Sequence, residues 1–377
     1  MILGIDLIAS DLASGTKSFN TNLLNQFLKN KSKEKIFIFI TRHYFDNIEV
    51  KKIPKNIKLV IKPNFLNKYL FKIIWMQIIL PFELKILGIK KIYSSMNYCP
   101  LICKILNIQI ILNVHSNLPW VYFDKMPGSI LKNIFIKYFM FVSIKLSDKL
   151  VVNSYYAKKE LIKKLKLKSK KIFVNYLGVE EINFERKNKI KKIKFDFKNR
   201  YILSVASCVR YHNFINILDA FKNTNYKKKK IKLVLIMQIL DKKYFEEIKN
   251  YVYKNFDNNE IFFFKNLNTN LLNKFYSKSF IYIFSSYCEV FGLTSLEAMK
   301  YKIPVLISNC SALPEVNGDA ALYFNPNNPR DISIKINKLI NSQRLRKSLI
   351  HKGIKQVNKF KWINTYRNLM KIITKKI

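Results

Sequence analysis

Glycine is scarce in this chain. Of 377 residues only eight are glycine, where average usage near 7% would give about 26. Acidic residues are scarce too, with 24 Asp and Glu against 68 Lys and Arg, so the net charge is +44. An anionic partner would explain that charge, but so would a genome drifting toward A and T, because Lys, Asn, Ile, Phe and Tyr are all abundant. Each remaining glycine therefore marks a position where backbone geometry is expected to require it.

Cysteine gives no sign of a disulfide or zinc scaffold. The chain has five cysteines, an odd number, and none of them forms a C-x-x-C pair. The N-terminus has no basic n-region, and Asp6 and Asp11 interrupt its apolar opening, so no export signal is visible. No apolar run is long enough to span a bilayer. The sequence therefore predicts a cytoplasmic protein, either free or at the inner face of the membrane.

What is present is a regular alternation of apolar runs and amphipathic segments. The runs consist mainly of Ile, Val, Phe and Leu, which is typical of strands buried on both faces of a parallel sheet. The segments between them indicate crossover helices, so the predicted fold class is α/β with doubly wound parallel sheets. The expected strands include Ile36–Ile40, Lys58–Ile61, Lys91–Tyr93, Ile108–Asn113, Lys149–Val152, Ile172–Tyr176, Tyr201–Val205, Lys232–Ile236, Ile261–Phe264, Ile281–Phe284, Val305–Ile307 and Ala321–Phe324, and the expected helices include Ala157–Leu167, Phe214–Phe221, Leu271–Tyr276 and Leu296–Tyr301.

A charged stretch without periodicity separates two halves of the chain. It runs from about Glu180 to Arg200, and it predicts one domain over residues 1–180 and a second over residues 181–358. Two doubly wound domains are expected to face each other across a cleft at the carboxyl ends of their strands, where such folds bind ligands.

The most informative segment covers residues 281–326. It reads as a strand, a loop and a helix that begins near Thr294, with Gly292 just ahead of the helix. The amides of Phe291, Gly292 and Leu293 can therefore approach a ligand without interference from a Cβ atom at Gly292. A helix N-terminus with unpaired amides is an anion site, and in a nucleotide-binding fold the expected anion is a diphosphate.

Two carboxylates bracket this segment. Glu289 lies in the loop and Glu297 lies one turn into the helix, where phosphates would repel both, so sugar or ribose hydroxyls are the more plausible partners. Each has a second interpretation. The run from Thr294 to Glu297 is also a capping-box pattern that stabilises a helix start without any ligand, and Glu289 could be a solvated loop acid.

The whole segment resembles the donor-binding motif of the retaining glycosyltransferases of family 4. That family typically shows E-G-F-G-L-x-x-x-E-A-M-A-x-G-x-P-V-I, followed by L-P-E-V and G-D-A-A. The matching residues here are Glu289, Phe291, Gly292, Leu293, Glu297, Ala298, Met299, Pro304, Val305, Leu313, Pro314, Glu315, Val316, Gly318, Asp319, Ala320 and Ala321.

The resemblance implies the GT-B fold, with two Rossmann-like domains and a C-terminal helix, here residues 359–377, that crosses back to the N-terminal domain. It also extends, more weakly, to other parts of the chain. Gly15 resembles the remnant of a glycine-rich loop beside the diphosphate, Arg210 and His212 resemble the family's phosphate-binding basic pair, and His115 resembles a histidine near the donor sugar. For His115, a purely structural role is an equal alternative.

The activity implied by the resemblance is transfer of a sugar from a nucleotide-diphosphate sugar to an acceptor hydroxyl with retention at the anomeric carbon. Arg210, His212 and the amides near Gly15 and Gly292 would stabilise the departing diphosphate. Glu289 would hold the donor sugar and Glu297 the ribose. No metal and no cofactor are expected, because no D-x-D pattern is present. The residues expected to bind the donor are Gly15, Phe291, Gly292, Leu293, Thr294 and Glu297.

Three departures from the family pattern stand out. Val290 replaces a glycine after the first glutamate, Lys302 replaces a glycine before Pro304, and His212 stands where the family has a lysine. His212 would contribute a full charge only when protonated, a form that adjacent phosphates favour. An altered donor or reduced activity would be consistent with these changes.

The acceptor is less defined. The best match is a saccharide or a lipid-linked saccharide of lipopolysaccharide or another surface polysaccharide. The apolar run Phe71–Phe82 could dock on an anionic membrane, or it could be a buried helix that ends at Pro81. The rival functions are a nucleic-acid binder driven by the positive charge, although no known binding motif supports it, and another GT-B enzyme such as a nucleotide-sugar epimerase or a phosphorylase.

Overall fold

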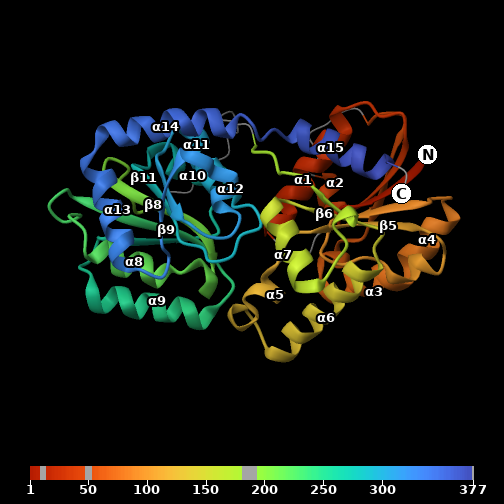
Figure 1. The fold of residues 1–377 in the computed structure, drawn as a ribbon, viewed down its shortest axis with the longest axis horizontal. Helices are drawn as coiled ribbons and strands as arrows, with labels where there is room; N and C mark the ends of the chain where they lie inside the picture. The colour runs from red at the N-terminus through yellow and green to blue at the C-terminus, as the bar shows by residue number, and fades with distance from the viewer. Residues whose placement is uncertain (9–13, 47–52, 181–192, 376–377) are drawn as a thin grey trace. The chain divides into compact units, whose positions relative to one another are not determined.

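The structure is a computed structural model that describes residues 1–8, 14–46, 53–180 and 193–375 (Figure 1). The chain divides into two compact units. The first comprises Met1–Asn117, Ile134–Gly178 and Lys361–Ile377, and the second comprises Leu118–Asn133 and Val179–Phe360. The expected boundary after residue 180 adjoins residues 181–192, which lie outside the described residues.

The first unit contains a seven-stranded sheet in which every pairing is parallel. Its strand order is β3-β2-β1-β4-β5-β6-β7, so the order reverses between β1 and β4. Strand residues are buried on both faces, as the apolar runs predicted. The strands are β1 (Ile2–Asp6), β2 (Lys35–Thr41), β3 (Ile57–Lys62), β4 (Lys91–Ser94), β5 (Gln109–Val114), β6 (Lys149–Val152) and β7 (Ile172–Val174).

Helices connect these strands, and the last helix of the chain also belongs to this unit, as predicted. α15 packs on α1 through a T-shaped contact between Phe27 and Tyr366. Gly178 is required here, because a Cβ atom at this position would lie 2.3 Å from the backbone nitrogen of Trp362. The helices are α1 (Ser14–Lys29), α2 (Arg42–Asp46), α3 (Tyr69–Ile74), α4 (Leu80–Ile86), α6 (Ile130–Leu146), whose first residues group with the second unit, α7 (Tyr155–Leu165) and α15 (Trp362–Thr374).

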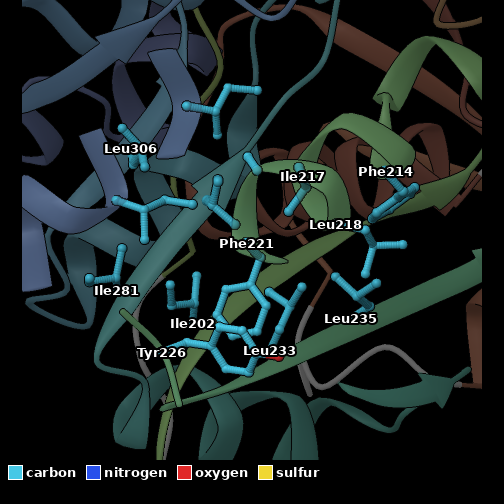
Figure 2. Packing of buried hydrophobic residues seen from close by; sticks show 14 of the residues in the cluster. Ile202, Phe214, Ile217, Leu218, Phe221, Tyr226, Leu233, Leu235, Ile281 and Leu306 are labelled. Atoms are coloured by element: carbon cyan, nitrogen blue, oxygen red, sulfur yellow. The ribbon is translucent and has the colours of Figure 1, made fainter. Parts of the chain in front are cut away.

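The second unit contains a six-stranded parallel sheet in the order β10-β9-β8-β11-β12-β13. Its core lies between the sheet and the helices that cover it; Figure 2 shows Phe221 of α8 beside the strand residue Leu233, and Leu218 of α8 beside Leu235. The strands are β8 (Arg200–Cys208), β9 (Ile231–Ile239), β10 (Ile261–Lys265), β11 (Ile281–Phe284), β12 (Val305–Ser308) and β13 (Ala321–Phe324).

Residues 118–133 contribute α5 (Leu118–Val121) to the second unit, although the sequence analysis placed them in the N-terminal domain. The Lys125 ammonium lies 4.1 Å from the centre of the Tyr287 ring. The other helices of this unit are α8 (Phe214–Lys222), α9 (Lys242–Asn255), α10 (Thr269–Lys278), α11 (Leu293–Lys300), α12 (Leu313–Asn317), α13 (Pro329–Asn341) and α14 (Gln343–Val357).

All the strands expected from the sequence are present, but the interpretation of Phe71–Phe82 as a buried helix ending at Pro81 is wrong. The helix continues through Pro81 to Ile86, with a π-helical turn, η2 (Trp75–Ile79), between α3 and α4. Several of its apolar side chains, including Phe71 and Phe82, are exposed. Among the described residues, no helix is both long and apolar enough to cross a membrane.

Candidate active site

The candidate site lies at the carboxyl edge of the second unit's sheet, where the strand order reverses. β8 pairs with β9, which follows it in the chain, and on its other side with β11. Doubly wound folds bind ligands at such a reversal, because the connections leave the two central strands in opposite directions. His212 follows β8 and Glu289 follows β11. The topology therefore brings together two residues that are 77 positions apart in the sequence.

His212 is held from both sides of its ring. Its Nδ1 atom lies 2.6 Å from the carbonyl oxygen of Ser207, and its Nε2 atom lies 3.2 Å from Oε1 of Glu289. Both partners are acceptors when Glu289 is ionised, so the ring satisfies them both only when each nitrogen carries a hydrogen. The two side chains are 9% and 19% exposed, which shields their interaction from water. With a hydrogen on both ring nitrogens, His212 would be a partly enclosed cation beside the carboxylate of Glu289.

Side-chain amides and backbone groups fix the loops that carry this pair. The amide of Tyr287 donates to the carbonyl oxygen of Tyr211 at 2.8 Å, which ties the loop after β11 to the loop after β8. Asn213 adopts a left-handed conformation and donates to the Pro326 carbonyl, beyond β13. The Ser311 hydroxyl accepts from the amide of Glu289 at 3.1 Å. Sequence reasoning missed Asn213 and Ser311 as supporting residues, because a single Asn or Ser in a loop carries no distinguishing signal.

α11 begins at Leu293, and Gly292 is its N-cap with φ of 85°. Only glycine adopts this conformation without strain, and a Cβ atom at Gly292 would also lie 2.3 Å from Cδ2 of Leu313. The Ser295 hydroxyl donates back to the carbonyl of Gly292 at 2.7 Å. The first amides of an α-helix have no partner within the helix, so the start of α11 presents donors in the segment that follows Glu289.

Glu297 faces a tyrosine instead of the helix terminus. The hydroxyl of Tyr276 donates to its Oε2 atom at 3.0 Å. Burial raises the pKa of Glu297 to about 7, and the Tyr276 hydrogen bond only partly opposes that rise. The capping-box interpretation is wrong, since the N-cap is Gly292 and not Thr294, which hydrogen-bonds to Tyr282 instead. The sequence predicted that Tyr276 lies in a helix, but it did not predict its contact with Glu297.

Arg210 points to different partners from His212. Its guanidinium makes two hydrogen bonds to the carboxylate of Glu247, lies 3.8 Å from Asp241 and stacks over the ring of Tyr244. All three belong to the start of α9 or the residue before it, on the β9 side of β8. His212 bonds toward the β11 side. The two residues expected as a basic pair therefore have separate partners in this structure.

His115 belongs to the first unit, directly after β5. Amide nitrogens of Asn113 and Asn153 lie 2.7 Å from Nε2 and 3.2 Å from Nδ1 of the ring. Burial lowers the pKa of His115 to about 4, so the ring is neutral at pH 7. A neutral ring accepts at one nitrogen only. Oδ1 of Asn153, buried and without a hydrogen-bond partner among the described residues, would meet the remaining N–H if that amide turned over.

Gly15 lies in the first turn of α1 in the first unit. The residues that lead into that turn, 9–13, lie outside the described residues. The structure therefore groups Glu289, Glu297, His212 and the start of α11 in the second unit, and Gly15 and His115 in the first.

The two glycine replacements near the site differ in their backbone consequences. Lys302 has φ of 61°, a left-handed conformation, whereas Val290 does not have positive φ. The amides of Lys302 and Ile303 donate to the carbonyls of Met299 and Ala298. These two bonds form a Schellman motif at the end of α11, with Lys302 at the position that usually requires glycine.

Comparison with known families identifies this region. The model of the family described as glycosyl transferases group 1 matches residues 185–356. Residues 185–356 belong to the glycosyl transferases group 1 family. The resemblance seen in the sequence is thereby confirmed, and the match includes His212, Glu289, Gly292 and Glu297.

Relatives within and beyond this match are distant. The chain is 24% identical over 232 residues to the O-antigen chain mannosyltransferase RfbU of Salmonella typhimurium, covering 58% of this chain and 57% of the relative. It is 37% identical over 89 residues to O-antigen chain mannosyltransferase B of Escherichia coli, covering 24% of this chain and 23% of the relative. The chain therefore spans little more than half of the first of these relatives and about a quarter of the second.

Solved structures agree with the fold. Anabaena HepE, in complex with UDP and glucose, aligns with a TM-score of 0.72 at 13% identity, over 100% of this chain and 99% of that chain. A glycosyltransferase from Rickettsia africae aligns with a TM-score of 0.65 at 18% identity, over 99% of this chain and 97% of that chain. The GT-B fold predicted from the sequence is confirmed.

Proposed function

We propose that the chain is a retaining glycosyltransferase that moves a hexose from a nucleotide-diphosphate sugar to an acceptor hydroxyl during assembly of lipopolysaccharide or another surface polysaccharide. The observation that carries this proposal is the His212–Glu289 pair, which lies where the strand order of the second sheet reverses. Glu289 is four positions before Leu293, the first residue of α11. The two O-antigen mannosyltransferases among the relatives support the pathway and the hexose. Five cysteines with free thiols are consistent with a cytoplasmic location.

The arrangement suits departure of a diphosphate. Negative charge gathers on that group as the bond to the sugar breaks, so fixed donors aimed at it stabilise the transition state more than the ground state. The first amides of α11 supply uncharged donors with a favourable helix dipole. A doubly protonated His212 supplies a cation, and Glu289 keeps that cation oriented through Oε1. This chemistry needs only residues of the chain; no metal and no cofactor are part of the proposal.

Each carboxylate retains capacity for a sugar. Oε1 of Glu289 is bonded to His212, which leaves Oε2 for a hydroxyl of the donor hexose. Oε2 of Glu297 accepts from Tyr276, which leaves Oε1 for the ribose. Arg210 would reach a phosphate only by releasing Glu247. Because Arg210 and Glu247 are 44% and 49% exposed, that ion pair is of the kind that contributes little to stability and is easily exchanged.

A thermal-shift screen tests the proposal directly. Nucleoside diphosphates and their sugars, including UDP-glucose and GDP-mannose, should raise the unfolding temperature in a saturable manner, because a ligand that binds only the folded protein stabilises it. The Glu289→Gln variant should lose stabilisation by the nucleotide sugar while keeping most of that by the nucleoside diphosphate. The proposal fails if no nucleotide stabilises the protein, or if it instead binds RNA with a steep dependence on salt.

A further inference from the structure

A stripe of exposed apolar side chains runs along the helix formed by α3, η2 and α4. Leu70, Ile74, Ile78, Phe82 and Ile86 follow one another at intervals of four residues, with exposures of 65%, 44%, 56%, 52% and 84%. Regular exposure of large apolar residues on one helix is unusual in a water-soluble surface, where such residues are scattered. We call these five residues the apolar stripe.

The π-helical turn keeps the stripe on one face. In an α-helix with 3.6 residues per turn, side chains four residues apart drift steadily around the axis. The turn Trp75–Ile79 contains an i→i+5 bond, in which the amide of Leu80 donates to the carbonyl of Trp75. Because a π-helical turn contains more residues than an α-helical turn, it rotates the following side chains back toward the same face. It also accommodates Pro81, whose missing N–H could not have continued an α-helical ladder.

The opposite face of the same helix is fixed to the first unit. Lys72, 2% exposed, forms a buried ion pair with Asp6 at the end of β1. The side-chain amide of Gln77 donates to the carbonyl of Cys99 and accepts from the amide of Leu101. Burial of one face and exposure of the other give the helix a defined orientation, with the stripe directed away from the core.

α6 adds a second exposed apolar face in the same unit. Ile134, Phe135 and Tyr138 are 51%, 51% and 67% exposed. The two helices lie on either side of Tyr98, which contacts Tyr69 in one direction and stacks on Phe139 of α6 in the other. The apolar surface is therefore contributed by two elements anchored to one segment.

The exposed charges at the ends of these helices are positive. Lys68 and Lys85 are exposed at the two ends of the stripe, and Lys145 is exposed at the end of α6. The α6 sequence contains no acidic residue. Within the stripe helix the single acid is Glu83, which is paired with Lys62. An apolar face bordered by lysines is the pattern of a helix that lies in the interface of an anionic bilayer.

We propose that the protein docks on anionic phospholipid membranes through the apolar stripe, with α6 beside it. Inserted side chains would remove apolar surface from water while Lys68, Lys85 and Lys145 contact the lipid headgroups. A second copy of the chain is the weaker candidate for this face, because two copies that each carry a net charge of +44 repel one another. The proposal goes beyond the proposed catalytic function and does not depend on it.

Vesicle co-sedimentation without any nucleotide tests the proposal, so its failure would leave the proposed function untouched. The full-length chain should bind vesicles of equal parts phosphatidylglycerol and phosphatidylcholine, and bind pure phosphatidylcholine about tenfold or more weakly. The triple variant Ile74→Ser, Ile78→Ser, Phe82→Ser should lose about tenfold or more of its binding to the anionic vesicles. The matched control replaces two exposed apolar residues of the second unit, Tyr253→Ser and Ile334→Ser, and should bind as the unmodified chain does.

Two further measurements keep the test decisive. If circular dichroism shows that the triple variant is misfolded, the double variant Lys68→Glu, Lys85→Glu replaces it, and it should show the same loss. Sedimentation velocity measures the oligomeric state. Equal binding by the stripe variants and the unmodified chain would overturn the proposal, as would equal binding to neutral and anionic vesicles. A dimer that the stripe substitutions dissociate would assign the face to a second copy instead.

Discussion

Nε2 of His212 lies 3.2 Å from Oε1 of Glu289, and this contact joins the loop after β8 to the loop after β11. Because the other ring nitrogen faces a backbone carbonyl, the ring cannot turn away from Glu289 without losing a second bond. A lysine at position 212 would bring permanent charge but not this two-sided restraint. At the proposed diphosphate subsite, the pair would therefore link the charge of His212 to the orientation of Glu289.

Removing the charge at position 212 should weaken nucleotide binding. In His212→Gln the hydrogen bonds are approximately kept but the cation is lost, and we expect the affinity for a nucleoside diphosphate to fall about tenfold, the usual effect of losing one bond to a charged group. His212→Lys should stay within about threefold of the unmodified chain. Isothermal titration calorimetry measures both, with the exposed His351→Gln as the control. Unchanged affinity in His212→Gln would remove this residue from the site.

Nucleotide-sugar affinity should increase as the pH rises through about 7, the pKa to which burial raises Glu297. The ionised carboxylate accepts hydrogen bonds from ribose hydroxyls more strongly than the neutral acid does. Glu297→Gln should abolish this increase in affinity with pH. Tyr276→Phe removes the bond that lowers this pKa and should move the midpoint to higher pH. A nucleotide sugar is the right ligand, since its diphosphate does not titrate here.

A dideoxyribose analogue of the same ligand provides the control for this prediction. Without ribose hydroxyls it should bind weakly and with no pH dependence from Glu297. The same pH profile for both ligands would place Glu297 away from the ribose.

His115 should make the protein sensitive to acid. Its pKa is about 4 in the folded chain and about 6.5 when unfolded, so the unfolded state binds the extra proton between these values. The contribution to stability is complete above pH 6.5 and is lost as the pH falls toward 4, by roughly 3 kcal/mol. Urea unfolding between these pH values should show a shallower pH dependence for His115→Asn than for the unmodified chain. His351→Gln should leave the dependence as it is; equal slopes in all three proteins would contradict the prediction.

Lys302→Gly should stabilise the second unit. A non-glycine residue in the left-handed conformation costs about 1 kcal/mol. Glycine adopts this conformation without strain, so at this position of the Schellman motif it would remove that cost. The free energy of unfolding should rise by about that amount. The control Lys347→Gly lies in the interior of α14, with helical backbone, and should lower stability by about 1 kcal/mol. A loss of stability in Lys302→Gly would show that the lysine side chain makes a compensating contact.

The sequence was sufficient for the parts of the fold that repeat. Apolar runs located every strand except β1, and the donor motif located Gly292 at the start of α11, because period and spacing are properties of the chain alone. It did not reveal that Leu118–Asn133 groups with the second unit. That grouping depends on contacts such as Lys125 with Tyr287, between residues 162 positions apart by their numbers, which leave no periodic signal.

The candidate site was only partly predictable for the same reason. Glu289, Glu297 and His212 were expected from the resemblance to the family motif, but their partners were not. Tyr276 reaches Glu297 from another helix, and Glu247 draws Arg210 toward α9. The sequence left the segment Phe71–Phe82 ambiguous, because proline usually ends a helix. The structure shows that the helix continues through Pro81 after a π-helical turn. Contacts between different helices and strands determine these features, and the pattern of residues along the sequence does not contain those contacts.

The place of α15 in the first unit has a consequence for biosynthesis. α15 groups with the first unit, yet the ribosome makes it after the whole of the second unit. The surface of the first unit that receives Trp362 and Leu369 therefore stays uncovered until residues 179–360 of the second unit have been made. Nascent chains stalled before residue 361 should therefore be the form that chaperones retain, and the second unit should become protease-resistant before the first.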